Sequence, residues 1–181
     1  MRFFYNRKIK LLFVSLSIFT CSFGQIFSKE LEIRSGFKEI KLDSGVHKIS
    51  CSYIGMTDTT RIFKYTGLSK FVYDAAISEL FIESDVHLKI TKLKIFTEKL
   101  SDEVFFSLPK KLKETFGEPN TIYKENTKTV GSIAWISKSN YLEFIYTYHE
   151  RGLWNVTIVM GKLHDLSKEV QDIYLKKNDD F

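Results

Sequence analysis

Two segments in the second half of the chain alternate apolar and polar residues on either side of a short loop. Within 141–148 and 153–160, the even-numbered positions carry Leu, Phe, Tyr and Tyr, and then Trp, Val, Ile and Met. A period of two is typical of half-buried strands, and the loop 149–152 contains the glycine of a tight reversal. A third β-type run, 129–136, precedes them across the turn 137–140. The sequence therefore predicts a three-stranded antiparallel meander.

A helix is expected just before this meander. Leu108, Leu112 and Phe116 recur every fourth residue, as on one face of a helix. Gly117 stands where a left-handed helix cap belongs, and Pro119 prevents continuation.

Two starts fit this helix. Ser101 followed by two acidic residues is a good N-cap, although Pro109 then falls inside the helix and kinks it. A start at Ser107 instead places Pro109 in the tolerated first turn.

The first half of the chain is rich in strand-forming residues. The runs 61–65, 71–73 and 77–83 are candidate strands, and 84–85 reads as a turn. In 86–96 the apolar residues occupy even positions up to Ile90 and odd positions from Leu93. One regular strand cannot place both sets on the same face, so we expect a β-bulge or break near Thr91 and Lys92.

These elements indicate an α+β domain with a mostly antiparallel sheet. Their order suggests a loose duplication, each half having a short helix or turn and three strands. A closing amphipathic helix is predicted from five residues at helical spacing: Leu163, Leu166, Val170, Ile173 and Tyr174. We expect a single domain over 25–175 and a solvated tail over 176–181.

The first 24 residues have the pattern of a secretory signal peptide. An apolar stretch, 11–19, follows a basic region, and a small-x-small site at 22–24 places Gln25 at the new N-terminus. The basic region contains four cations: Arg2, Arg7, Lys8 and Lys10. Without them the 27 basic residues fall to 23 against 22 acidic ones. This near-neutral balance argues against nucleic-acid binding, and we expect no transmembrane helix in the exported chain.

The two cysteines bear on location and redox state. Cys21 follows the apolar stretch and offers an alternative to soluble export, namely lipid attachment, although Thr20 before it is atypical of such sites. Cys51 is then the remaining cysteine, so no internal disulfide is expected. The predicted location is the periplasm or the exterior of a bacterium.

Three stretches give the chain a resemblance to known proteins: 37–42 (FKEIKL), the strand pair within 77–97, and 112–119 (LKETFGEP) with the Trp-bearing strand after it. This layout resembles small exported bacterial proteins of unknown function. The helix-plus-meander part is similar to outer-membrane-assembly lipoproteins and inhibitor proteins. The resemblance implies a binding or envelope-maintenance role and carries no catalytic residues.

Local motifs for chemistry are missing from the sequence. It contains no Cys-x-x-Cys, His-Glu-x-x-His, Gly-x-Ser-x-Gly or glycine-rich phosphate loop, so we predict no catalytic residues, no metal and no cofactor. His47 and Cys51 would lie close together only on a helix. The alternation of apolar residues over 49–53 favours a strand, which would separate them.

The best binding candidates lie on the meander. Charged residues at the tip of a rigid hairpin are well placed for recognition, and here they are His149, Glu150 and Arg151. Tyr141 and Glu143 lie on the polar face of the same strand. The sequence predicts a non-enzymatic protein-binding function, including an inhibitor or immunity-type role, with another envelope or secreted protein as partner. The alternatives are an enzyme or small-ligand carrier whose pocket is assembled from distant residues, and a lipid-anchored structural protein.

Overall fold

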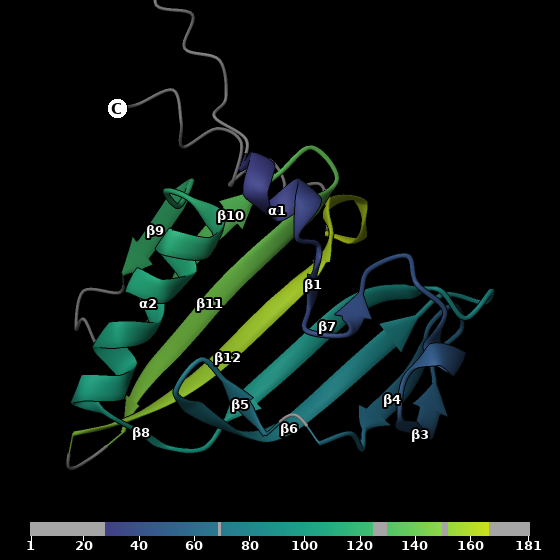
Figure 1. Ribbon diagram of the computed structural model, residues 1–181, viewed down its shortest axis with the longest axis horizontal. Coiled ribbons are helices and arrows are strands. Elements are labelled where there is room, and N and C mark those ends of the chain that lie inside the picture. The colour runs from purple at the N-terminus through teal and green to yellow at the C-terminus, as the bar shows by residue number, and fades with distance from the viewer. Residues whose placement is uncertain (1–27, 69, 125–129, 150–151, 167–181) are drawn as a thin grey trace, which may run out of the picture.

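A ten-stranded antiparallel sheet organises the described part of the chain (Figure 1). The computed structural model describes residues 28–68, 70–124, 130–149 and 152–166. Eight strands follow one path across the sheet, in the order β3-β4-β6-β7-β12-β11-β10-β9. The predicted α+β class with a mostly antiparallel sheet is therefore confirmed.

The first half supplies one side of this sheet and the second half supplies the other. The first-half strands are β3 (Cys51–Met56), β4 (Arg61–Tyr65), β5 (Phe71–Val72), β6 (Ala75–Ser84) and β7 (Ile90–Thr97). The second-half strands are β8 (Leu100–Ser101), β9 (Thr121–Lys124), β10 (Val130–Ile136), β11 (Asn140–His149) and β12 (Leu153–Lys162). Each half contributes four strands to the main path, one more than the three expected, and their last strands, β7 and β12, pair at the centre.

The meander has the expected registration. Leu142, Phe144 and Tyr146 of β11 are buried, as are the even-numbered residues of β12 from Trp154 to Met160. Phe144 pairs with Ile158 across the two strands, and Gly152 adopts a positive φ of 72° in the connecting loop. These side chains form the sheet side of the main hydrophobic core.

The bulge expected in the first half lies at Thr91. Glu83 pairs with Lys92, whereas the next residue of β6, Ser84, pairs with Ile90. Thr91 is thus the additional residue on β7, and it allows both Ile90 and Leu93 to be buried. The strand itself begins at Ile90, because 85–88 form a turn in which Leu88 has a φ of 60°.

The main helix, α2 (Asp102–Phe116), covers one face of the sheet (Figure 1). It starts after Ser101, the first of the two predicted starts, and accommodates Pro109 in its interior. It ends as expected at Gly117, whose φ of 83° is in the region that glycine adopts most readily. Its buried residues, Phe105, Leu108, Leu112 and Phe116, face the core.

A segment at the start of the described chain packs over the same face. It comprises α1 (Lys29–Ile33), β1 (Gly36–Phe37), β2 (Ile40–Lys41) and the one-turn helix η1 (Val46–Lys48). We call residues 28–48 the N-terminal segment. It adds Leu31, Ile40, Leu42 and Val46 to the core that α2 shares with the sheet. Its α1 contacts both α2 and β11.

The predicted C-terminal helix is wrong over the residues that the structure describes. After β12 the chain forms a single 3₁₀ turn, η2 (Leu163–Asp165), and Leu166 is already extended, with ψ of 144°. Leu163 and Leu166 pack against Ala134 and Ile136 of β10. Their spacing therefore places both side chains against the sheet and does not mark the apolar face of a helix. The other residues of that predicted helix, 167–174, lie outside the described ranges.

Within the described ranges, every helix falls short of the length and hydrophobicity that a membrane crossing requires. The predicted signal peptide and Cys21 lie outside these ranges.

Candidate binding cavity

A cavity of about 450 Å³ opens between the sheet and the elements that cover it. Its floor consists of Leu93 and Ile95 of β7, Leu142 of β11, and Ile158 and Met160 of β12. Met160 pairs with Leu93, and Ile158 pairs with Ile95, so these side chains come from directly opposed positions on the two central strands. The floor is therefore a continuous aliphatic surface.

Three segments that are far apart in the sequence wall the cavity. They are the N-terminal segment, the β5 region and α2. The lining side chains from these segments include Ile33, Phe37, Val72, Tyr73, Leu112, Thr115 and Phe116. A mostly apolar cavity of this size with a few polar groups is the usual form of a small-molecule site.

Three cationic side chains also line the cavity: Arg34, Lys38 and Lys41, all exposed to solvent. They come from the residue that caps α1, the β1–β2 turn and β2. None of the three forms a salt bridge with an acidic residue in the described ranges. The Lys38 Nζ lies 5.5 Å from the centre of the Phe37 ring, beside the apolar lining.

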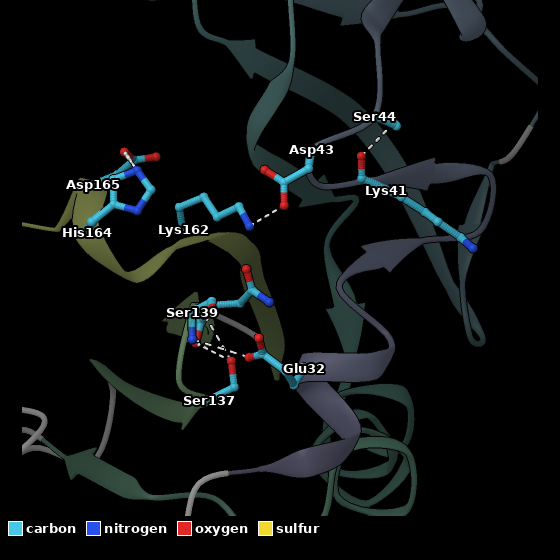
Figure 2. A network of polar contacts seen from close by, with 10 residues as sticks. Glu32, Lys41, Asp43, Ser44, Ser137, Ser139, Lys162, His164 and Asp165 are labelled. Carbon is cyan, nitrogen blue, oxygen red and sulfur yellow. Dashed lines mark hydrogen bonds and ion pairs between the residues drawn. The ribbon is translucent and has the colours of Figure 1, made fainter.

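Polar contacts fix the N-terminal segment to the end of the sheet (Figure 2). A Glu32 carboxylate oxygen of α1 accepts a hydrogen bond from the Ser139 backbone N–H at 3.2 Å, and Lys162 forms an ion pair with Asp43. Burial by itself would raise the pKa of Glu32, but hydrogen bonds from Ser137 and Ser139 and the charge of Lys162 lower it overall. The carboxylate is thus held in its charged form as an anchor.

Ser28 adds a second anchor at the start of α1. Its hydroxyl donates to the Phe116 carbonyl at 2.5 Å and accepts from the Leu31 N–H at 3.1 Å. Its backbone N–H donates to the Ile136 carbonyl at 2.9 Å. One buried serine therefore joins α1, the end of α2 and β10, and this junction fixes one wall of the cavity.

The opposite wall is held by the two-residue turn between β5 and β6. Tyr73 has a φ of 52°, a strained value for a bulky residue, and its hydroxyl lies 2.6 Å from the Thr115 hydroxyl on α2. Asp74 forms an ion pair with Lys111 of the same helix. Burial raises the pKa of Tyr73, so its hydroxyl is neutral at physiological pH. These contacts tie the turn to α2 beside the cavity.

The residues predicted for binding on β11 lie on the other face of the sheet from the cavity. Tyr141 is only 3% exposed, and its ring lies over Gly161, its partner on β12. Burial and the nearby carboxylates of Glu143 and Glu83 raise the pKa of Tyr141. Glu143 is half-buried on the same face. Their role in binding stays a prediction.

His149 is exposed at the end of β11, far along the strand from Tyr141. Glu150 and Arg151, which complete the predicted hairpin tip, lie outside the described ranges. The structure brings Tyr141 and Glu143 together and separates both from His149.

The possible His47 and Cys51 pair does not form an activated thiol. His47 belongs to η1 and its ring lies over Gly45, while Cys51 begins β3 and its thiol faces the Val46 carbonyl at 4.0 Å. Burial raises the pKa of Cys51, which disfavours the thiolate needed for nucleophilic chemistry. Across the described ranges, no group of three or more His, Cys, Asp and Glu residues is arranged to hold a metal ion.

Sequence reasoning did not identify the cavity residues. The cations Arg34, Lys38 and Lys41 stand among acidic residues such as Glu39 and Asp43, and therefore read as an ordinary solvated surface. Only the contacts of those acids in the folded chain reveal the excess of positive charge. Comparison with protein-family models, curated proteins and solved structures gave no match.

Proposed function

We propose that this protein binds a small, largely apolar molecule in the cavity between the N-terminal segment, α2, β5 and the sheet. The observation that carries the proposal is the aliphatic floor, contributed by β7, β11 and β12 and left open beneath its walls. Protein interiors are normally filled to crystal-like density. An open apolar volume of about 450 Å³ is therefore better explained as space for a ligand than as part of a sealed core.

The lining favours binding over catalysis. No His, Cys, Asp or Glu is among the described residues that line the cavity. The side chains that the sequence offers for chemistry, such as His47, Cys51 and His149, lie elsewhere. We therefore favour a carrier or receptor for a small molecule over an enzyme with a long-range active site.

The predicted signal peptide adds a location to this proposal. A chain cleaved after Gly24 would encounter its ligand in the periplasm or outside the cell, and a lipid on Cys21 would instead hold it at a membrane. Intact mass of the protein from its own host distinguishes the two forms. A mature N-terminus at Gln25 supports soluble export, and a mass increase by a lipid at Cys21 supports anchoring.

Binding to another protein is the other expectation from the sequence. An inhibitor that recognises its target through charge would present a surface whose charged residues all have the same sign. The charged residues of β4, β6 and β7 instead pair with opposite charges, as in Lys64 with Glu79 at 2.7 Å and Lys94 with Glu83 at 2.6 Å. This mixed surface does not favour a charged inhibitor.

Titration with Nile red, a neutral polarity-sensitive dye, tests the ligand-binding proposal. We expect a saturable rise in fluorescence that Ile158→Phe abolishes, because Ile158 lies on the cavity floor. Val159→Phe is the matched control, because the neighbouring residue of β12 points to the other face and does not line the cavity. Circular dichroism is used to check that both variants fold. Equal dye binding by the two variants would contradict the proposal.

A further inference from the structure

The entrance of the cavity carries more positive charge than the sequence suggests. Arg34, Lys38 and Lys41 all line it and are all exposed. Together they place three positive charges within a segment of eight residues. An anion at this entrance would meet those charges directly above an apolar interior.

Two acidic residues that neighbour these cations in the sequence, Glu39 and Asp43, have other partners. Glu39 accepts a hydrogen bond from the Tyr65 hydroxyl of β4, and this bond is the main reason that the pKa of Glu39 is lowered; the charge of Lys38 makes a smaller contribution. Asp43 is paired with Lys162 at the end of β12 (Figure 2).

The β5 side of the cavity follows the same pattern. Asp74 is paired with Lys111 of α2. The charge of Glu114 also reaches Tyr73 of the lining, and the charge of Arg34 opposes it there. Among the described residues that line the cavity, three are cationic and none is acidic, so the lining itself carries an excess of positive charge.

The floor indicates the shape of the apolar part of a ligand. Leu93, Ile95, Leu142, Ile158 and Met160 are all aliphatic or thioether side chains. Such a surface accommodates a flexible hydrocarbon chain, and the aromatic side chains of Phe37, Tyr73 and Phe116 lie on the walls around it. The cations on the N-terminal segment are exposed to solvent, so the polar end of a ligand beside them would stay in contact with water.

We propose that the ligand is a singly charged anionic amphiphile with one hydrocarbon chain, a class that includes long-chain carboxylates and sulfates. Its chain lies on the floor formed by β7, β11 and β12, and its acidic group lies beside Arg34, Lys38 and Lys41. This inference rests on the proposed function, because it specifies the molecule that the cavity holds. The recognition combines burial of hydrocarbon with charge-assisted hydrogen bonds to the acidic group.

Competition against Nile red with three chain-matched compounds tests this inference. The compounds are dodecanoate, dodecanol and dodecylamine, used below the concentrations at which they aggregate, on the full-length native protein. Surface charge pairs each contribute modestly, so three cations should favour dodecanoate over dodecanol by about tenfold. Dodecylamine should bind more weakly than both. Added salt should reduce the advantage of dodecanoate because it screens exposed charges.

A triple variant, Arg34→Gln, Lys38→Gln and Lys41→Gln, should remove the preference for dodecanoate and leave dodecanol binding unchanged. The matched control replaces Lys48, Lys89 and Lys110 with glutamine, because these lysines are exposed and do not line the cavity. The control should keep the full preference. This comparison separates local recognition from an effect of net charge.

The outcomes distinguish this inference from the proposed function. Equal affinity for the three compounds, or an equal loss of preference in the triple variant and its control, overturns the anionic class and leaves an apolar-ligand cavity in place. If the preference for dodecanoate holds, separate titrations with a carboxylate and a sulfate of the same chain length define the acidic group. If the protein binds neither Nile red nor any of the three compounds, both proposals are overturned together.

Discussion

Replacement of Phe105 by alanine should be among the most destabilising single changes in this protein. Phe105 is 5% exposed, and its ring stacks on Trp154 with 3.9 Å between the ring centres and 4° between the planes. The ring also meets Tyr146 edge-on at 5.3 Å. The neighbouring Phe106 is 58% exposed and meets this cluster only edge-on, which makes Phe106→Ala a matched control in the same helical turn.

The expected magnitudes follow from burial. Deleting a buried phenylalanine ring costs about 3–5 kcal/mol, and the strand residues around Phe105 are fixed by the sheet, so the site cannot collapse and the upper part of that range applies. The control loses its edge contacts with Phe105 and Trp154, at centre distances of 5.0 and 6.1 Å, and should cost about 1 kcal/mol. Helix propensity changes equally in both variants and cancels.

Urea unfolding followed by far-ultraviolet circular dichroism measures both variants. The free energy of unfolding should fall by about 3 kcal/mol more for Phe105→Ala than for Phe106→Ala, with similar denaturant slopes. Losses within about 1 kcal/mol of each other would show that the stacked cluster does not stabilise the join between α2 and the sheet.

Two further predictions concern the other face of the sheet. The Glu83 side chain is 14% exposed and forms ion pairs with Lys94 and Lys92. Burial alone would raise the pKa of Glu83, but these two lysines lower it below 4.5 overall. The ionised Glu83 therefore stabilises the fold above pH 4.5, and this stabilisation is lost as the pH falls. Glu83→Gln should flatten the pH dependence of the free energy of unfolding in urea between about pH 5 and pH 3. An unchanged pH dependence would refute the role given to Glu83. At Gly161 a methyl group would lie 2.9 Å from the Tyr141 ring, so Gly161→Ala should cost about 1–3 kcal/mol and lower the thermal midpoint; a neutral or stabilising result would show that the ring moves freely.

The sequence predicts those elements of this fold that depend on neighbouring residues. The alternation over 141–160 fixes which side chains of β11 and β12 enter the core, because the period of two allows only one face to be apolar. The change of parity between Ile90 and Leu93 likewise requires the bulge at Thr91. Gly117 ends α2 because of its own backbone freedom.

The features that the sequence does not predict depend on distant partners. Leu163 and Leu166 have helical spacing, yet contact with Ala134 and Ile136 selects a 3₁₀ turn and extended backbone instead. The cavity combines residues from six separate stretches of the chain, and no local pattern marks them as neighbours. Its charge depends on where Glu39 and Asp43 find partners, which only the fold determines.

The central pairing of β7 with β12 has a consequence for the order of folding. Every other long pairing of the main path joins strands that are close in sequence, so the two halves can each form as local meanders before they meet. The join between β7 and β12 closes the longest loop of the sheet and is expected last. A fragment that ends before the second half would expose β7 as an unpaired edge, and a fragment containing only the second half would expose β12. Either fragment should therefore associate with a second copy of itself through that edge, or with the complementary half when the two are mixed.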